Sequence, residues 1–312
     1  MKEYQISVAI CTYNRPEMLR CALETLACQE TDGKIKWEIL IIDNDPDCSA
    51  KHIFEKAVST SPIPLQYIEE RNAGLSYARN RAIVESRGEI IAFLDDDTLV
   101  PRTWLMEMLG TFERTGADCV GGRVLVGWEG CPDENLKECE RELVAFDKGD
   151  QDFRIVGRKV SPIGANLAFR ANLFSNGVRF PTNLGRLRTN LMGCEEVKLL
   201  LRLKEQGRSI WYSANSMVTH RTGGERLTEG YYIRREYWNG VSLAIVDRSQ
   251  KKQSYCFLKA WIRIMQVCFA LAPCWLFSRI MGNRRRRLLN TCYILKYFGY
   301  WKSMMGLARK TE

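Results

Sequence analysis

Short apolar segments alternate with helical patterns along the first ~125 residues, and few folds can accommodate this alternation. The segments that predict strands are 6–11, 37–42, 65–68, 89–94 and 119–126. Between them, helical patterns begin near Pro16, Ser76 and Pro101. Two strands joined by a crossover helix run parallel, because the helix returns the chain to the same end of the sheet. The alternation therefore predicts an α/β fold with a mostly parallel central sheet and flanking helices.

After residue 126 the regular alternation weakens. The expected elements are an extended segment at 160–169, a helix at 195–206, a short strand at 216–220 and a long helix at 228–247. From Tyr255 onward the pattern is helical and strongly apolar. We therefore expect a separate helical region, basic and apolar, over residues 228–312.

The net charge of +9 comes from this C-terminal region. Between Ser249 and Thr311 the chain has thirteen Lys and Arg residues and no Asp or Glu. The first 250 residues carry 33 basic and 36 acidic side chains, which leaves them close to neutral. Any preference for an acidic partner therefore belongs to the tail.

The twelve cysteines are scattered, and no two have the Cys-x-x-Cys spacing. No long hydrophobic stretch precedes the first predicted strand, so we expect no secretory signal peptide. Reduced thiols in the cytoplasm are therefore expected rather than a disulfide framework. His52 and His220 are the only histidines, which disfavours a zinc site.

Polar clusters follow three of the predicted strands. They are Thr12–Arg15, Asp43–Asp45 and Asp95–Asp97. Ligands bind at the carboxyl ends of the strands in open parallel sheets. We therefore expect the three clusters to meet in one crevice.

The carboxylates at Asp95–Asp97 follow the apolar run Ile90–Leu94. Adjacent carboxylates repel one another, so this arrangement costs stability unless a cation lies among them. Carboxylate oxygens and a phosphate complete the octahedral shell that Mg²⁺ or Mn²⁺ prefers. The alternative is an acidic cap on the following helix, because carboxylates also suit the helix dipole.

A second polar segment, Asn72–Asn80, contains a glycine at the start of a predicted helix. Gly74 allows an unusual turn, and the helix N-terminus after it can face a diphosphate. Arg79, one turn further on, would face the same crevice. Taken alone, this stretch is better explained as an ordinary turn with a solvated arginine, and Asp43 alone could cap a helix.

Together these residues resemble the successive signatures of family 2 glycosyltransferases, which have the GT-A fold. The matching segments, in the family's order, are Ala9–Arg15, Ile41–Asn44, Asn72–Gly74, Ala78–Asn80, Phe93–Asp97, Gly164–Arg170, Gly193–Glu196 and Val218–His220. The resemblance covers about the first 245 residues, and the set is far more specific than any one member. It implies a GT-A domain over 1–227, with a nucleotide-binding half to about residue 125 and an acceptor half over 126–227.

The resemblance also implies roles in the crevice. The nucleotide-binding residues would be Thr12, Asn14, Asp43, Gly74, Arg79, Asp95 and Asp96. Thr12, Asn14 and Asp43 would contact the nucleobase, and Asp96 would contact the ribose or the sugar. Asp97 would bind the metal ion, Mn²⁺ or Mg²⁺, with His220 as a further ligand. A lone histidine is usually structural, but its place after a strand and the acidic D-x-D element upstream favour a ligand here.

On the acceptor side, Gly164, Ala165 and Asn166 match the family's acceptor-side strand. The family usually has Glu-Asp where this chain has Glu195-Glu196, and the Asp takes the proton of the acceptor hydroxyl. Glu is as basic as Asp but one methylene longer. We expect Glu196 to be the catalytic base, with Glu195 the second candidate. The alternative is a pair of acids that suit a helix start.

The basic tail contains an apolar run, 264–277, that is shorter than the ~20 residues of a spanning helix, and we expect Pro273 to interrupt it. One interpretation is an interfacial or re-entrant segment held against anionic lipid by Arg284–Arg287. Another is amphipathic helices packed on the catalytic domain. A third is nucleic-acid binding, which the high Trp, Phe and Leu content disfavours.

The resemblance therefore implies an inverting, hexosyltransferase-type enzyme that uses a UDP-sugar, the family's commonest donor, and a saccharide or lipid-linked acceptor. We expect it in the cytoplasm, peripheral on the inner face of the membrane, in cell-surface polysaccharide or glycolipid synthesis. A nucleotidyltransferase is an alternative, but it would have a Gly- and Lys/Arg-rich loop where this chain reads Thr12–Pro16. A non-catalytic nucleotide-sugar-binding protein is the other, although the acidic residues are all present.

Overall fold

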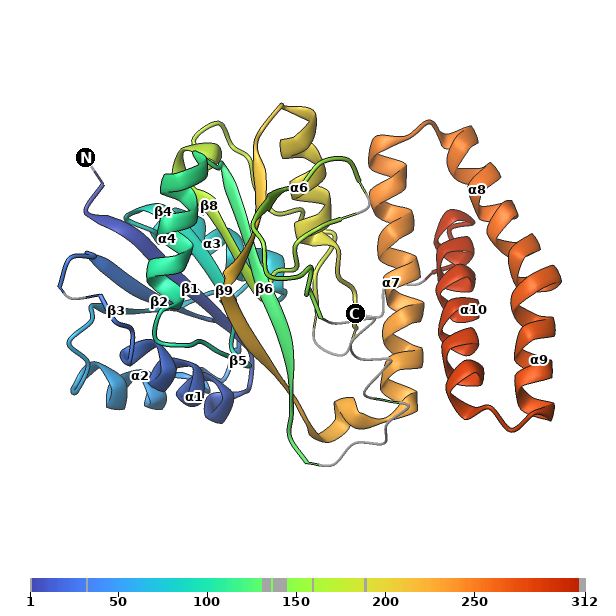
Figure 1. Cartoon of the computed structure of the whole chain (residues 1–312), viewed down its shortest axis with the longest axis horizontal. Helices are drawn as coiled ribbons and strands as arrows, with labels where there is room; N and C mark the ends of the chain where they lie inside the picture. The colour runs from blue at the N-terminus through green and yellow to red at the C-terminus, as the bar shows by residue number, and fades with distance from the viewer. Residues whose placement is uncertain are drawn as a thin grey trace. The chain divides into compact units, whose positions relative to one another are not determined.

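The computed structural model describes residues 2–308 apart from 32, 131–135, 137–144, 159, 188, 189 and the side chain of Glu225. The chain forms two compact units (Figure 1). The first comprises Met1–Gly127, Ala145–Thr182 and Glu196–Arg221. The second comprises Thr222–Glu312 and the described residues of Trp128–Val144 and Asn183–Glu195.

Four parallel strands form one half of the sheet in the first unit. They are β1 (Tyr4–Thr12), β2 (Trp37–Asp43), β3 (Leu65–Glu69) and β4 (Gly88–Asp95), in the order β3-β2-β1-β4. β2 is buried along its whole length, and β1 and β4 are buried at almost every position. Apolar side chains on both faces are typical of a parallel sheet covered by helices on either side. The predicted parallel arrangement is confirmed here.

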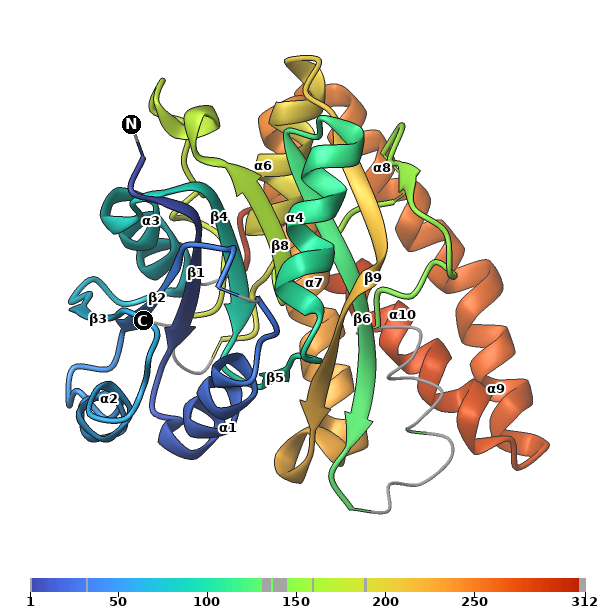
Figure 2. The ribbon, with the colours of Figure 1, turned by 60° about the vertical axis from the view of Figure 1, so that its left-hand side comes forward.

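Four α-helices connect and flank these strands (Figures 1 and 2). They are α1 (Pro16–Ala27), α2 (Lys51–Val58), α3 (Leu75–Glu85) and α4 (Trp104–Thr115). Helices α1, α3 and α4 are predicted from the sequence, and Pro16 opens α1 at its first position. Helix α2 is not predicted, because it is short and buries only Ile53.

The rest of the sheet is antiparallel. Strand β8 (Asn166–Arg170) runs antiparallel to β4 and to β6 (Cys119–Trp128). Next to β6 lies β9 (Ile210–Thr222), which pairs antiparallel with β5 (Thr98–Leu99) and β7 (Phe153–Arg154). The sheet is therefore mixed, with its parallel strands confined to the first half.

Two strand lengths differ from the sequence expectation. The extended segment 160–169 becomes a strand only from Asn166, after Pro162, which cannot donate to a sheet ladder. The strand expected at 216–220 extends over Ile210–Thr222. Buried serines interrupt its apolar pattern, and the hydroxyl groups of Ser213 and Ser216 lie 3.0 Å apart in a hydrogen bond that makes their burial tolerable.

An ion pair between buried Glu38 and partly exposed Arg87 helps to join three strands, toward the strand ends opposite the polar clusters. The Glu38 carboxylate accepts hydrogen bonds from the Ser7 hydroxyl at 2.6 Å and from the Arg87 guanidinium at 2.6 and 3.0 Å. The Ser7 oxygen in turn accepts the Gly88 N–H at 2.8 Å. These contacts fix β1, β2 and β4 relative to one another, so the carboxyl ends of the same strands are held in register.

The second unit is helical. Its long elements are α7 (Glu229–Gln250), α8 (Gln253–Gln266), the π-helical segment η3 (Val267–Leu271), α9 (Ala272–Ile280) and α10 (Arg284–Met304). The short η2 (Gly224–Leu227) precedes α7. The expected long helix and the helical apolar tail are both present.

Pro273 does not interrupt the apolar helix as the sequence suggested. Elements α8, η3 and α9 form one continuous helix, Gln253–Ile280, of 28 residues. The π-helical turn lies just before the proline. Proline has no backbone N–H group to donate to the preceding turn, and the π-helical turn accommodates this missing hydrogen bond. By length and composition this helix could cross a membrane, so the expectation that the run is too short to span does not hold.

Two glycines allow α7 and α10 to pack backbone to backbone. A β-carbon at Gly240 of α7 would overlap the main-chain carbonyl of Lys296 on α10. A β-carbon at Gly299 of α10 would overlap the carbonyl of Tyr237 on α7. The contact therefore depends on the absence of side chains at these two positions.

We expect Gly240→Ala to destabilise the protein by about 1–3 kcal/mol, because the added methyl group forces two helices apart. Gly230→Ala, in the same helix, is the matched control, because no atom lies within 4 Å of its β-carbon position. That change should be neutral or slightly stabilising. Urea unfolding midpoints measure both effects, and equal midpoints would contradict this packing.

Candidate active site

The three polar clusters lie at adjacent strand ends, as the sequence predicts. Thr12 at the end of β1 pairs with Asp43 at the end of β2. On the other side of β1, Cys11 pairs with Asp95 at the end of β4. Strands β1 and β4 point to the same edge of the sheet (Figure 2). The sheet register alone therefore brings the clusters together.

Each carboxylate of the Asp95–Asp97 triplet accepts from a different set of donors. The Thr12 hydroxyl donates to Asp96 at 2.8 Å. Arg15 Nη1 bridges Asp96 and Asp97 at 3.2 and 3.1 Å. Arg79 Nη2 lies 3.2 Å from Asp95. The sequence gives Arg15 no role of its own, whereas in the structure it is a counter-ion of the triplet.

Burial makes the charge of the triplet costly. Asp96 and Asp97 are only 5% and 3% exposed. Burial raises the pKa of the Asp96 carboxyl above its usual range, the charge of Asp97 raises it further, and Arg15 and Thr12 oppose this. A bound cation at this strand end would lower the cost of keeping these carboxylates ionised.

A group of possible metal ligands forms beside the triplet. One oxygen each from Asp95 and Asp97 and a ring nitrogen of His220 lie within 4.8 Å of one another. His220 Nε2 is 3.3 Å from Asp97 Oδ1. Pairing of β5 with β9 places His220 opposite Thr98, one residue after the triplet. Two carboxylates and an imidazole suit a divalent ion such as Mn²⁺, and Asp95, which the sequence assigned to the nucleotide, is part of this group.

Arg79 is buried beside the triplet rather than solvated. Its guanidinium contacts Asp95 and lies over the ring of Phe180, 5.5 Å from the centroid. A β-carbon at Gly164 would overlap this guanidinium. Gly164, expected on the acceptor side, therefore provides the space that Arg79 occupies.

Asp43 is almost fully buried and stabilises the local backbone. Its carboxylate accepts hydrogen bonds from the N–H groups of Asp45 and Ala50 at 3.0 and 2.9 Å. It also accepts the Tyr67 hydroxyl at 3.0 Å. Ala50 is the residue before α2, so Asp43 holds the backbone just ahead of that helix, and nucleobase binding remains a prediction for it.

The turn before α3 is held by Asn44, a residue to which the sequence assigned no role of its own. Its amide donates to the carbonyl groups of Glu70 and Asn72 at 2.7 and 2.8 Å, and its oxygen accepts the Gly74 N–H at 2.7 Å. Gly74 has a φ of 129°, a conformation that strongly favours glycine. Asn14, with a φ of 51°, is exposed after β1.

The other acceptor-side residues lie in the core. Ala165 and Asn166 are buried, and Asn166 begins β8. The Asn166 amide donates to the carbonyl of Ser216 at 2.6 Å, and its oxygen accepts the Trp104 indole N–H at 3.1 Å. These contacts give Asn166 a structural role in joining β8, β9 and α4.

The two candidate bases open helix α6 (Glu195–Glu205). Glu195 is buried and Glu196 is half-buried. Cys194 precedes them with a φ of 68°. The helix dipole favours both acids at this position. Helix stabilisation and catalysis therefore explain their position equally well.

Comparison with known proteins identifies the family. Residues 7–175 match the model described as Glycosyl transferase family 2. The chain belongs to this family. The match spans more than half of the chain and includes the Asp triplet and Gly164–Asn166, so the nucleotidyltransferase alternative is set aside.

Two curated relatives illustrate the likeness. The glucosyl-dolichyl phosphate glucuronosyltransferase of Haloferax volcanii is 24% identical over 78% of this chain and 77% of its own length. The succinoglycan biosynthesis protein ExoM of Rhizobium meliloti is 34% identical, over 38% of each chain. The second match is thus confined to a part of both proteins.

Solved structures confirm the GT-A fold. The mannosyltransferase PcManGT from Pyrobaculum calidifontis, in complex with GDP-Man and Mn²⁺, aligns with a TM-score of 0.67, 16% identity and coverage of 97% of this chain and 88% of that chain. S. aureus TarS 1-349, in complex with UDP-GlcNAc, aligns with a TM-score of 0.50 and 17% identity, over 97% and 91% of the two chains.

Arg15 is expected to compete with a metal ion for the triplet, because its guanidinium bridges two of the three carboxylates. Arg15→Gln should therefore raise the affinity for Mn²⁺ by about tenfold, which corresponds to about 1.4 kcal/mol. Arg20→Gln is the control, because Arg20 pairs with Glu17 and Glu24 on the surface of α1. Calorimetric titration measures the constants, and weaker Mn²⁺ binding by Arg15→Gln would contradict the competition.

Proposed function

We propose that the chain is an inverting, metal-dependent hexosyltransferase that transfers a sugar from a nucleoside diphosphate sugar to a hydroxyl group. The observation that carries this proposal is the group of Asp95, Asp97 and His220 at the carboxyl ends of the sheet. A uridine diphosphate sugar is the proposed donor, and a saccharide or lipid-linked molecule is the proposed acceptor. The GDP-Man, UDP-GlcNAc and Mn²⁺ in the complexes of the structural neighbours support this chemistry.

In the proposed site, Thr12, Asn14 and Asp43 hold the nucleobase, and the N-terminus of α3 after Gly74 faces the diphosphate. Asp96 contacts the ribose or the sugar. Asp95, Asp97 and His220 hold Mn²⁺ or Mg²⁺, which when bound offsets negative charge on the departing diphosphate.

The proposed reaction is a single displacement. Glu196 accepts the proton of the acceptor hydroxyl, whose oxygen forms a bond to the anomeric carbon. The bond from that carbon to the diphosphate oxygen breaks on the opposite face, so the configuration inverts. The proton ends on Glu196, and the nucleoside diphosphate leaves as the second product.

The metal site is tested by Asp97→Asn, which keeps the shape of the side chain and removes its charge. We expect transfer to be abolished and the unfolding midpoint to change little. Asp47→Asn, an exposed change after β2, is the control and should retain activity. Full transfer by Asp97→Asn in a buffer with a chelator would contradict the metal assignment.

The catalytic base is tested by two adjacent substitutions. Glu196→Gln should lower kcat by about 10²–10⁴, as expected for a lost general base, with little change in nucleotide affinity. Glu195→Gln should have a smaller effect. If Glu195→Gln is the more damaging change, the base is Glu195.

We also propose that the protein is cytoplasmic and acts at the inner face of the membrane, in cell-surface polysaccharide or glycolipid synthesis. The basic, apolar helical tail and the dolichyl phosphate in the name of one relative support this location. A thermal-shift screen of sugar nucleotides would identify the donor, because a ligand that binds the folded state raises its stability. A panel in which no sugar nucleotide shifts the midpoint would contradict the donor class.

A further inference from the structure

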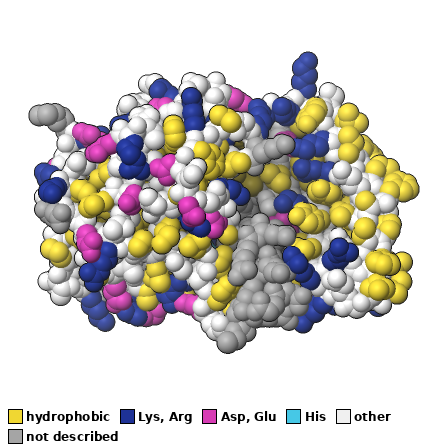
Figure 3. Space-filling view, viewed as in Figure 1, with side chains coloured by type: hydrophobic (Ala, Val, Ile, Leu, Met, Phe, Trp, Pro, Cys, Tyr) yellow, Lys and Arg dark blue, Asp and Glu magenta, His cyan; other side chains and the backbone are white. Residues whose placement is uncertain are grey.

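The helix Gln253–Ile280 has a continuous apolar stripe on its solvent side. The stripe, called here the outer stripe, consists of Leu258, Ile262, Met265, Phe269, Leu276 and Ile280. These residues recur at the three-, four- and seven-residue spacings that define one face of a helix. Phe269 is 79% exposed and Ile280 is 74% exposed. Hydrophobic side chains gather along this edge of the second unit in Figure 3.

The opposite face of the same helix is small or polar. Cys256, Ala260 and Ser278 are its buried residues. The two charged side chains in the middle of the helix also turn to this face: Lys259 lies 2.6 Å from Asp247, and Arg263 lies over the ring of Tyr300, 3.9 Å from the centroid. A helix of a water-soluble protein has the reverse arrangement, with its large apolar residues packed inward.

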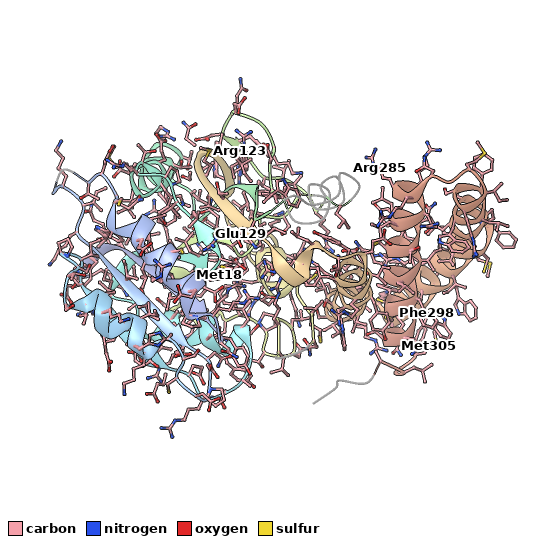
Figure 4. The ribbon with its side chains drawn as sticks, turned by 90° about the horizontal axis from the view of Figure 1, so that it is seen from below. Met18, Arg123, Glu129, Arg285, Phe298 and Met305 are labelled. Carbon is pink, nitrogen blue, oxygen red and sulfur yellow. The ribbon has the colours of Figure 1, made fainter. Side chains whose placement is uncertain are left out.

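Basic residues lie at both ends of the outer stripe. Lys251 and Lys252 precede the helix, and exposed Arg279 and Arg286 lie at its far end and at the start of α10. Arg285 and Phe298 of α10 are labelled in Figure 4. No acid occurs between Ser249 and Thr311, although Arg309 and Lys310 lie outside the described residues. An apolar stripe with cations at its ends suits an anionic lipid surface better than a nucleic acid, which offers no apolar layer.

The charges on the neighbouring helices indicate that Gln253–Ile280 lies in the membrane plane and does not span the bilayer. Helix α10 packs along α8, η3 and α9, and α7 packs on α10. These two helices carry charges along their lengths, including the pair of Glu236 and Lys296, 2.9 Å apart. A spanning Gln253–Ile280 helix would carry them into hydrocarbon, at about 2.5–3.5 kcal/mol for each charge near the centre.

We propose that the outer stripe is a monotopic membrane-docking surface, in which Gln253–Ile280 lies in the plane of an anionic leaflet and inserts its large side chains. This inference rests on the proposed membrane location and not on sugar transfer. Its failure would leave the transferase proposal intact, because vesicle binding is measured without donor or acceptor.

The stripe is tested by sedimentation of the full-length protein with vesicles of 30% phosphatidylglycerol and 70% phosphatidylcholine. Phe269→Glu should lower the partition coefficient by about tenfold or more, because it replaces an inserted aromatic ring with a charge. Val84→Glu is the matched control, because Val84 of α3 is 64% exposed in the first unit. Equal effects of the two changes, or no binding by the unaltered protein, would overturn the proposal. Unfolding midpoints show whether either variant is misfolded.

The charge contribution is tested by the double change Arg279→Gln and Arg286→Gln. Binding to the anionic vesicles should fall by about thirtyfold, as expected for two cations that each contribute about 1 kcal/mol near the surface, and binding to neutral vesicles should not change. High salt should release the protein only partly, because screening leaves the hydrophobic part. Complete release in moderate salt would show electrostatic adsorption without insertion and overturn the proposal.

The orientation is tested with a membrane-impermeant maleimide. Gln253→Cys and Met281→Cys mark the two ends of the helix. In the background, serine replaces Cys28, Cys268 and Cys274, the exposed cysteines among the described residues, and Cys131 and Cys139, which lie outside them. In-plane docking predicts that both ends react from outside the vesicle. If one end reacts only after detergent is added, the helix spans the bilayer and the in-plane arrangement is wrong.

Discussion

Mutual repulsion among three consecutive carboxylates at the end of β4 is the constraint around which the first unit is built. Asp96 and Asp97 are nearly buried, so each must be offset by a donor or a cation. Thr12, Arg15, Arg79 and His220 provide these contacts from β1, the β1–α1 connection, α3 and β9. The sheet register and the absence of a side chain at Gly164 bring them together. A site with this much convergent charge suits a polyanionic ligand bound through a cation.

Much of this arrangement could be predicted from the sequence, because buried parallel strands are apolar on both faces and their ends are marked by polar residues. The family signatures then located Asp97 and His220, which lie together. Arg15 and Asn44 were not assigned roles, since an arginine or an asparagine after a strand has many uses that only the contacts distinguish. The full length of β9 could not be predicted, because Ser213 and Ser216 interrupt its apolar pattern. Their burial depends on hydrogen bonds that no apolar pattern reveals.

The tail shows a different limit of sequence reading. Its composition disfavours nucleic acid but does not choose between lipid and packing on the catalytic domain, because an apolar helix has the same composition whichever side its large residues face. The structure shows which side of the helix these residues occupy. Phe269 and Ile280 point to solvent, while Lys259 and Arg263 contact α7 and α10. Pro273 was expected to break the helix, but the π-helical turn before it absorbs the local misfit. Periodicity alone does not anticipate such a compensation.

The central claim is that a divalent ion on the strand-end carboxylates binds the diphosphate of the donor. Linkage requires that such an ion and the sugar nucleotide strengthen each other's binding. The most direct measurement is calorimetric titration of the protein with a UDP-sugar, once with Mn²⁺ and once with a chelator. The account predicts binding at least about tenfold tighter with Mn²⁺, a coupling free energy of about 1.4 kcal/mol. Equal affinity under the two conditions would contradict it.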